Sequence, residues 1–143
     1  MIKTSYEEEL NRKGTFTYTC SGISMLPLLR QRKDLFTIEK PKGRCKKYDV
    51  VLYKRPPESY VLHRIVEVRE NDYVILGDNC FYKEYGICDE DIIGIMTSFV
   101  RNGKQYPVSN KWYRLYAVVW YCLYPLRKLW MRCKQILRFC KKR

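Results

Sequence analysis

Between residues 14 and 108, short runs of alternating apolar and polar residues are separated by clusters of Gly, Pro, Asn and Asp. Alternation with a period of two is typical of half-buried β-strands, and such clusters mark turns. The breaks recur about every ten residues, which favours antiparallel pairing. We therefore predict a mainly β, antiparallel, barrel-like domain over 14–108, with strands at 16–20, 35–39, 49–53, 60–68, 73–76, 92–100 and 105–108.

A polar segment, 1–13, precedes this domain. Residues 5–13 are expected to form a short helix, because Thr4 or Ser5 can cap it and three glutamates follow in its first turn. Gly14 is expected to end the helix. The segment has no apolar run of the kind found in a signal peptide or membrane anchor.

The pattern changes after residue 108, and 109–143 form a basic amphipathic helical tail in our prediction. Apolar residues recur at helical spacing, and Pro125 is expected to divide two helices with a kink. The apolar run at 115–124 is too short to cross a membrane, which needs about 20 residues. The tryptophans of this segment are Trp112, Trp120 and Trp130.

Charge separates the two parts of the chain. Residues 1–100 hold 16 Lys/Arg and 15 Asp/Glu, whereas 101–143 hold 12 Lys/Arg and no acid. A tail with this balance favours an anionic partner. Residues 111–143 are therefore expected to lie on an anionic membrane surface, or else to pack on the β domain, and nucleic acid is a less favoured partner. The first alternative implies a cytoplasmic protein at the inner face of the cell membrane.

Seven cysteines and one histidine give no spacing that is typical of a zinc site, and the sequence contains no Cys-x-x-Cys pair. The odd number of cysteines points to reduced thiols inside the cell. We expect neither a metal nor a cofactor.

The stretch Ser21–Pro27 contains the best candidate nucleophile. Ser24 lies between Gly22, which permits a sharp bend, and Pro27, which interrupts regular structure. A serine hydroxyl needs an adjacent base to react at neutral pH, and the only histidine, His63, is the side chain whose ordinary pKa suits that role. A carboxylate in the Gly77-Asp78-Asn79 turn could hold the imidazole, because the strand before this turn is expected to pair with the strand of His63.

Three motifs resemble, in the same order, the conserved boxes of the type I signal peptidase family, which is allied to the LexA-type self-cleaving repressors. They are Ser24-Met-Leu-Pro27, His63-Arg-Ile-Val66 and Gly77-Asp-Asn79. The resemblance covers about residues 14–100. It implies a largely antiparallel β fold and a serine endopeptidase that works through an acyl-enzyme, with Ser24 as nucleophile and His63 as general base.

The chain departs from the family pattern in three ways. It shows no N-terminal transmembrane anchor, and Gly22 stands where many bacterial members have a second serine, so backbone N–H groups near Ser24 would have to stabilise the oxyanion. The third catalytic member is also open: Asp78 is preferred and Glu84 is the alternative. A non-catalytic module that binds a peptide or a nucleic acid is the alternative function.

Overall fold

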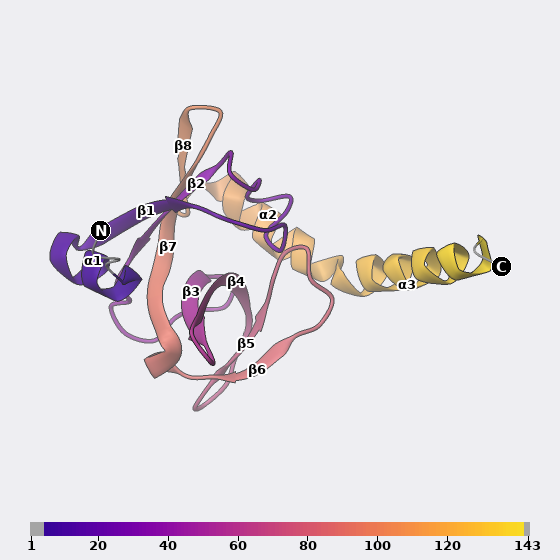
Figure 1. Ribbon diagram of the computed structural model, residues 1–143, viewed down its shortest axis with the longest axis horizontal. Helices are drawn as coiled ribbons and strands as arrows, with labels where there is room; N and C mark the ends of the chain where they lie inside the picture. The colour runs from indigo at the N-terminus through magenta and orange to yellow at the C-terminus, as the bar shows by residue number, and fades with distance from the viewer. Residues whose placement is uncertain (1–4, 142–143) are drawn as a thin grey trace.

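The computed structural model describes residues 5–141 and is built around one antiparallel sheet (Figure 1). Its strands follow the order β1-β2-β7-β3-β4-β5-β6, and β8 pairs with β7 beside this path. The strands are β1 (Thr15–Thr19), β2 (Leu35–Glu39), β3 (Val50–Arg55), β4 (Ser59–Val68), β5 (Tyr73–Leu76), β6 (Glu84–Ile87), β7 (Ile92–Arg101) and β8 (Lys104–Pro107).

The sheet does not close into a barrel, so the expected barrel-like closure is wrong for the residues that the structure describes. Strands β1 and β6 lie at the two ends of this order, and β8 pairs with β7 alone. Register shifts bend the sheet at four of its pairings, but β6 is only four residues long and offers little edge for further pairing. The other edge is covered by a helix instead.

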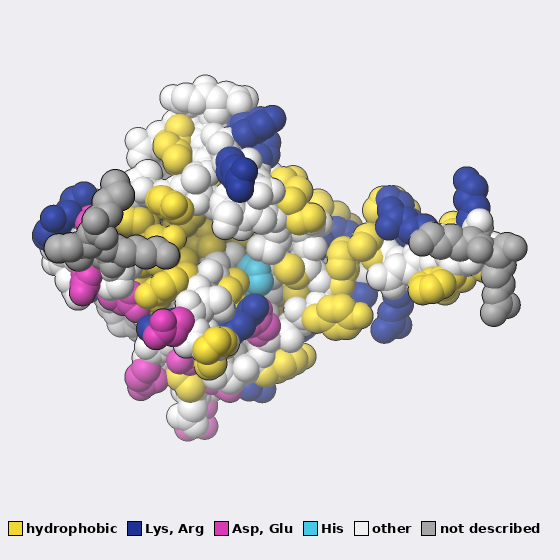
Figure 2. All heavy atoms as spheres, viewed as in Figure 1, with side chains coloured by type: hydrophobic (Ala, Val, Ile, Leu, Met, Phe, Trp, Pro, Cys, Tyr) yellow, Lys and Arg dark blue, Asp and Glu magenta, His cyan; other side chains and the backbone are white. Residues whose placement is uncertain are grey.

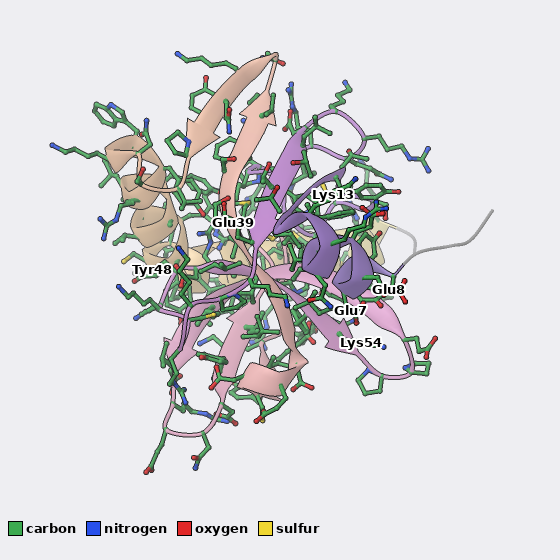
Figure 3. The ribbon with its side chains drawn as sticks, turned by 90° about the vertical axis from the view of Figure 1, so that its left-hand side faces the viewer. Glu7, Glu8, Lys13, Glu39, Tyr48 and Lys54 are labelled. Carbon is green, nitrogen blue, oxygen red and sulfur yellow. The ribbon has the colours of Figure 1, made fainter. Side chains whose placement is uncertain are left out.

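That helix is α1 (Tyr6–Lys13), which begins at a capping box between Ser5 and Glu8 and ends at Gly14, as predicted. Tyr6 packs edge-on against three aromatic rings of the sheet. Glu7 accepts a hydrogen bond from the Tyr60 hydroxyl at 2.7 Å and lies 3.9 Å from Lys54 Nζ (Figure 3). The helix is thereby attached to the β3–β4 hairpin as well as to β1. The rings are those of Phe16, Tyr18 and Tyr60.

Most predicted strands are confirmed within one or two residues, but the stretch from 77 to 91 is more ordered than its sequence indicated. It holds β6 and a short 3-10 helix, η1 (Asp89–Asp91). Apolar and polar residues do not alternate along β6, so the sequence shows no sign of a strand there. Residues 84–87 form a strand because they pair with β5.

The core has two main clusters. Helix α2 (Lys111–Cys122) packs against the one that contains Leu29 and Phe99. Asn110 caps this helix, and Ala117 is buried on the side that faces the sheet. A third, smaller cluster joins β4 and β5 to the start of α3 (Tyr124–Lys141) through Tyr124. The first cluster includes Leu10, Leu29, Phe36, Ile38, Met96 and Phe99, and the second includes Tyr53, Ile65, Tyr73 and Ile75.

Helices α2 and α3 meet at Leu123, two residues before Pro125, where the sequence predicted a kink. Beyond this junction α3 extends away from the sheet (Figure 1). Among the helices of residues 5–141, none combines the length and the apolar character that a membrane span requires.

A buried ion pair connects the sheet to α2. The Arg64 guanidinium of β4 donates two hydrogen bonds of 2.8 Å to the Asp78 carboxylate, and both side chains are almost fully buried. Tyr113 and Tyr116 of α2 complete the group: Arg64 donates to the Tyr113 hydroxyl, and Tyr116 donates to Asp78. Burial disfavours the Arg64 charge, but the Asp78 carboxylate outweighs it and raises the pKa of Arg64.

Replacing Arg64 by leucine should destabilise the fold by about 3–5 kcal/mol, because a buried carboxylate would lose its counter-charge. Arg69→Leu is the matched control, since it removes an ion pair with Asp72 at the surface and should change stability far less. Denaturant unfolding of both variants measures the difference. Equal losses of stability would contradict the importance of the buried pair.

Candidate active site

Ser24 lies in a turn between β1 and β2, as the sequence predicted. Gly22 has φ +96°, a conformation that glycine adopts without strain and other residues rarely do. The buried side chains of Met25 and Leu29 attach the turn to the core. Ser24 itself remains partly exposed.

The loop of residues 77–83, which joins β5 to β6, holds this turn in place. The Asn79 main-chain N–H donates to the Ser24 carbonyl at 2.8 Å, and its side-chain amide donates to the Ile23 carbonyl at 3.1 Å. The third sequence motif therefore lies directly against the first one.

His63 is the buried centre of the site, with 5% of its surface exposed. It sits on β4 opposite Val51 of β3. A Cβ on Gly77 would lie 2.9 Å from His63 Nε2 and 2.8 Å from the Ser24 carbonyl oxygen, which places these two atoms less than about 6 Å apart. Only a glycine at position 77 lets the imidazole and the serine turn approach each other so closely.

The other ring nitrogen, His63 Nδ1, faces two oxygens. It is 3.3 Å from the Tyr53 hydroxyl and 3.3 Å from Glu84 Oε1. Tyr53 donates its single hydroxyl proton to Glu84 Oε1 at 2.8 Å, and a carboxylate can only accept. Nδ1 must therefore carry the proton of the neutral ring, which leaves the lone pair on Nε2.

Nε2 is buried and has no hydrogen-bond partner in the part of the chain that the structure describes. Buried polar atoms are usually satisfied, so an acceptor left open in this way points to a function. Nε2 lies beside Gly77 and the Ser24 turn, but no hydrogen bond joins it to the Ser24 hydroxyl in this structure.

The structure separates the two carboxylates that were candidates for the third position. The preferred one, Asp78, is committed to Arg64 and Tyr116, whereas Glu84 approaches the imidazole. The preference for Asp78 does not fit this geometry. Asp78 is unavailable to His63 because the buried guanidinium of Arg64, the next residue in the sequence, requires a carboxylate as its own counter-charge.

Glu84 is fixed by two further groups. Arg55 donates to both of its carboxylate oxygens, and Tyr53 donates to one of them. Burial lowers the pKa of His63 below its ordinary value of 6.5, an effect that Glu84 opposes and Arg55 reinforces. Burial and the adjacent Glu84 raise the pKa of Tyr53, which keeps this hydroxyl protonated.

Ser24, His63 and Glu84 line one cleft of about 590 Å³. The only histidine of the chain is visible between apolar side chains on the face shown in Figure 2. The cleft is bounded by the serine turn, by β4 and by the end of the 77–83 loop, and its lining includes Ser21, Ser24, Tyr60, His63, Phe81 and Glu84.

Helices α2 and α3 also hold the 77–83 loop. Besides the bond from Tyr116 to the Asp78 carboxylate, four hydrogen bonds cross this contact, and three of them end on main-chain oxygens of the loop. The loop is therefore fixed between the tail and the cleft. The bonds run from Trp120 and Arg127 to Asp78, from Tyr124 to Phe81, and from Lys83 to the Tyr121 hydroxyl.

Sequence reasoning missed Tyr53, Arg55 and the hydrogen bonds of Asn79. The strand register contains a signal for Tyr53: Val51 pairs with His63, so Tyr53, two residues further on, shares its face of the sheet. Within residues 5–141, no cluster of His, Cys, Asp and Glu side chains could hold a metal ion, and the cysteines are all free thiols.

Comparison of the chain with protein-family models, with curated proteins and with solved structures found no match.

The chain has a single histidine, so its imidazole gives an unambiguous long-range ¹H–¹⁵N NMR spectrum. We expect the proton on Nδ1 in the neutral form and a titration midpoint below about 6.5. Glu84→Gln should lower the midpoint further, because it removes a negative charge that favours the imidazolium. Glu67→Gln, an exposed change on the same strand, is the control. A neutral ring protonated on Nε2 would refute the assignment of the base.

Proposed function

We propose that this protein is a serine endopeptidase in which Ser24 is the nucleophile, His63 the general base and Glu84 the residue that orients the imidazole. The observation that carries the proposal is the open, buried Nε2 of His63 beside the Ser24 turn, with Nδ1 facing Glu84 and Tyr53. A base poised in this way is what a serine hydroxyl needs to become a nucleophile.

In the proposed reaction, His63 Nε2 accepts the Ser24 hydroxyl proton while Oγ attacks a peptide carbonyl carbon. The resulting imidazolium is stabilised by Glu84 and then gives its proton to the leaving amine, so that an acyl-enzyme and a free amino terminus form. Water next attacks the ester, with His63 accepting its proton and returning it to Ser24. The second product is a carboxylic acid, and Ser24 is restored.

The oxyanion is assigned to main-chain donors. Gly22 removes the side-chain hydroxyl that many bacterial signal peptidases have two residues before the nucleophile. The main-chain N–H groups of Ser24 and Met25 donate to no backbone or side-chain acceptor within residues 5–141, so they are free to bind a developing negative charge. Both belong to the turn that Asn79 holds.

Two features support an extended peptide as substrate. The cleft mixes polar and apolar walls, which suits a polypeptide better than a small charged molecule. The motif order around Ser24, His63 and Gly77–Asn79 resembles the type I signal peptidase family, and we include in the proposal that the open sheet is a variant of the signal-peptidase and LexA type of β fold.

Ser24→Ala should abolish labelling by a fluorophosphonate probe and reduce peptide cleavage by about three orders of magnitude or more, since it removes the nucleophile. Cleavage is followed by mass spectrometry of a mixed peptide library. Ser21→Ala is the matched control, because Ser21 lines the same cleft and has no role in the proposed chemistry. Labelling of Ser24→Ala at the wild-type rate would refute the proposal.

The rate of Ser24 labelling should rise with pH as His63 loses its proton, because only the neutral ring can act as base. Burial lowers the pKa of His63, so the midpoint should lie below about 6.5 and the rate should be level above neutrality. Stopped labelling reactions across a pH series measure this profile. A rate that climbs only above about pH 8 would exclude His63 as the base.

A further inference from the structure

Helix α3 carries a continuous apolar stripe. With about 100° between successive residues, its members fall within an arc of about 120° that contains no charged residue. Only Met131 and Phe139 are apolar and lie outside it after Pro125. The stripe consists of Leu126, Leu129, Trp130, Cys133, Ile136, Leu137 and Cys140.

This stripe faces away from the β domain. Leu126 and Leu129 lie next to the domain in the sequence, yet they are 65% and 59% exposed. Arg127, Lys128 and Met131, on other sides of the same two turns, are half-buried. The part of α3 that touches the domain is therefore the side opposite the stripe, and folding of the chain leaves the stripe uncovered. Figure 2 shows apolar side chains exposed along this helix.

Cations flank the stripe on both edges and no acid accompanies them. Lys134, Arg138 and Lys141 follow one edge, and Lys128 and Arg132 follow the other. Residues 101–143 contain no Asp or Glu. A second copy of the chain would bring cations against cations on this surface, so self-association is disfavoured.

We propose that α3 binds an anionic phospholipid surface and lies in the plane of its interface. The apolar stripe would enter the acyl boundary, while the flanking lysines and arginines extend to the phosphate groups. Trp130 belongs to a residue type that prefers this depth. The basic flanks select for anionic over neutral lipid.

The exposed side of α2 extends the same surface. Trp112, Leu115 and Val119 are exposed on α2, at the spacing of three and four residues that Leu123 and Leu126 continue across the junction. Since α2 and α3 are hydrogen-bonded to the 77–83 loop, lipid binding would hold the cleft at a fixed position near the membrane surface. This inference does not depend on the proposed peptidase activity.

Sedimentation of the full chain with vesicles tests the proposal. We expect binding to phosphatidylcholine vesicles that contain about one-third phosphatidylglycerol, and much weaker binding to pure phosphatidylcholine. Leu137→Asn should lower the partition coefficient at least about threefold, because it removes apolar area from the stripe. Phe139→Asn is the matched control: it is the same kind of change at an exposed position on the opposite side of the helix and should have a smaller effect.

Three results would overturn the proposal. They are no binding to either vesicle type, equal effects of the two substitutions, and a dimer in the absence of lipid that Leu137→Asn dissociates. Duplex DNA provides a further test. If DNA releases the protein from vesicles and Leu137→Asn does not change this release, nucleic acid would be favoured as the partner, which would also count against lipid. Both variants are first compared with the wild type by thermal unfolding and by Ser24 labelling, so that a failure of lipid binding is separated from a failure of the peptidase.

Discussion

The fold and the candidate site depend on one buried ion pair, Arg64 with Asp78. Two charges removed from water must be matched closely, and here the carboxylate accepts two hydrogen bonds from Arg64 and one from Tyr116. The pair links the middle of β4 to the end of β5 and to α2. Backbone pairing already fixes β4 relative to β5, and the ion pair adds the side-chain hydrogen bonds that connect both strands to α2.

The ion pair also positions the chemistry, because the residues beside it in the sequence form the site. Side chains alternate along a strand, so holding Arg64 on one face of β4 holds His63 on the other. Likewise, fixing Asp78 fixes Gly77, which leaves room for the imidazole, and Asn79, which binds the Ser24 turn. The buried charges therefore act on the site through the backbone and not through contact with the reacting groups.

This arrangement explains how far the sequence could be interpreted. The alternation of apolar and polar residues was enough to predict the long strands, and Gly22 and Pro27 were enough to predict the serine turn, since both depend on local sequence. His63 was identified because a serine nucleophile needs a base. The choice between Asp78 and Glu84 required knowledge of which acid pairs with Arg64, and that is a tertiary contact. Closure of the sheet depended on its edges: β6 has no periodic pattern, and α1 covers the opposite edge.

The tail, which the charge pattern marked as a separate segment, combines residues that support the 77–83 loop with residues that form an exposed apolar surface. Tyr116, Trp120 and Arg127 bond to Asp78, so α2 and the first turn of α3 belong to the support of the 77–83 loop. Removing residues 111–143 would expose the buried ion pair and release the loop that leads to Glu84. Loss of activity on truncation would therefore reveal nothing about lipid, whereas the exposed stripe beyond Leu126 can be altered without touching these contacts. The support of the loop therefore extends past the change in composition near residue 109, through α2 and into the first turn of α3.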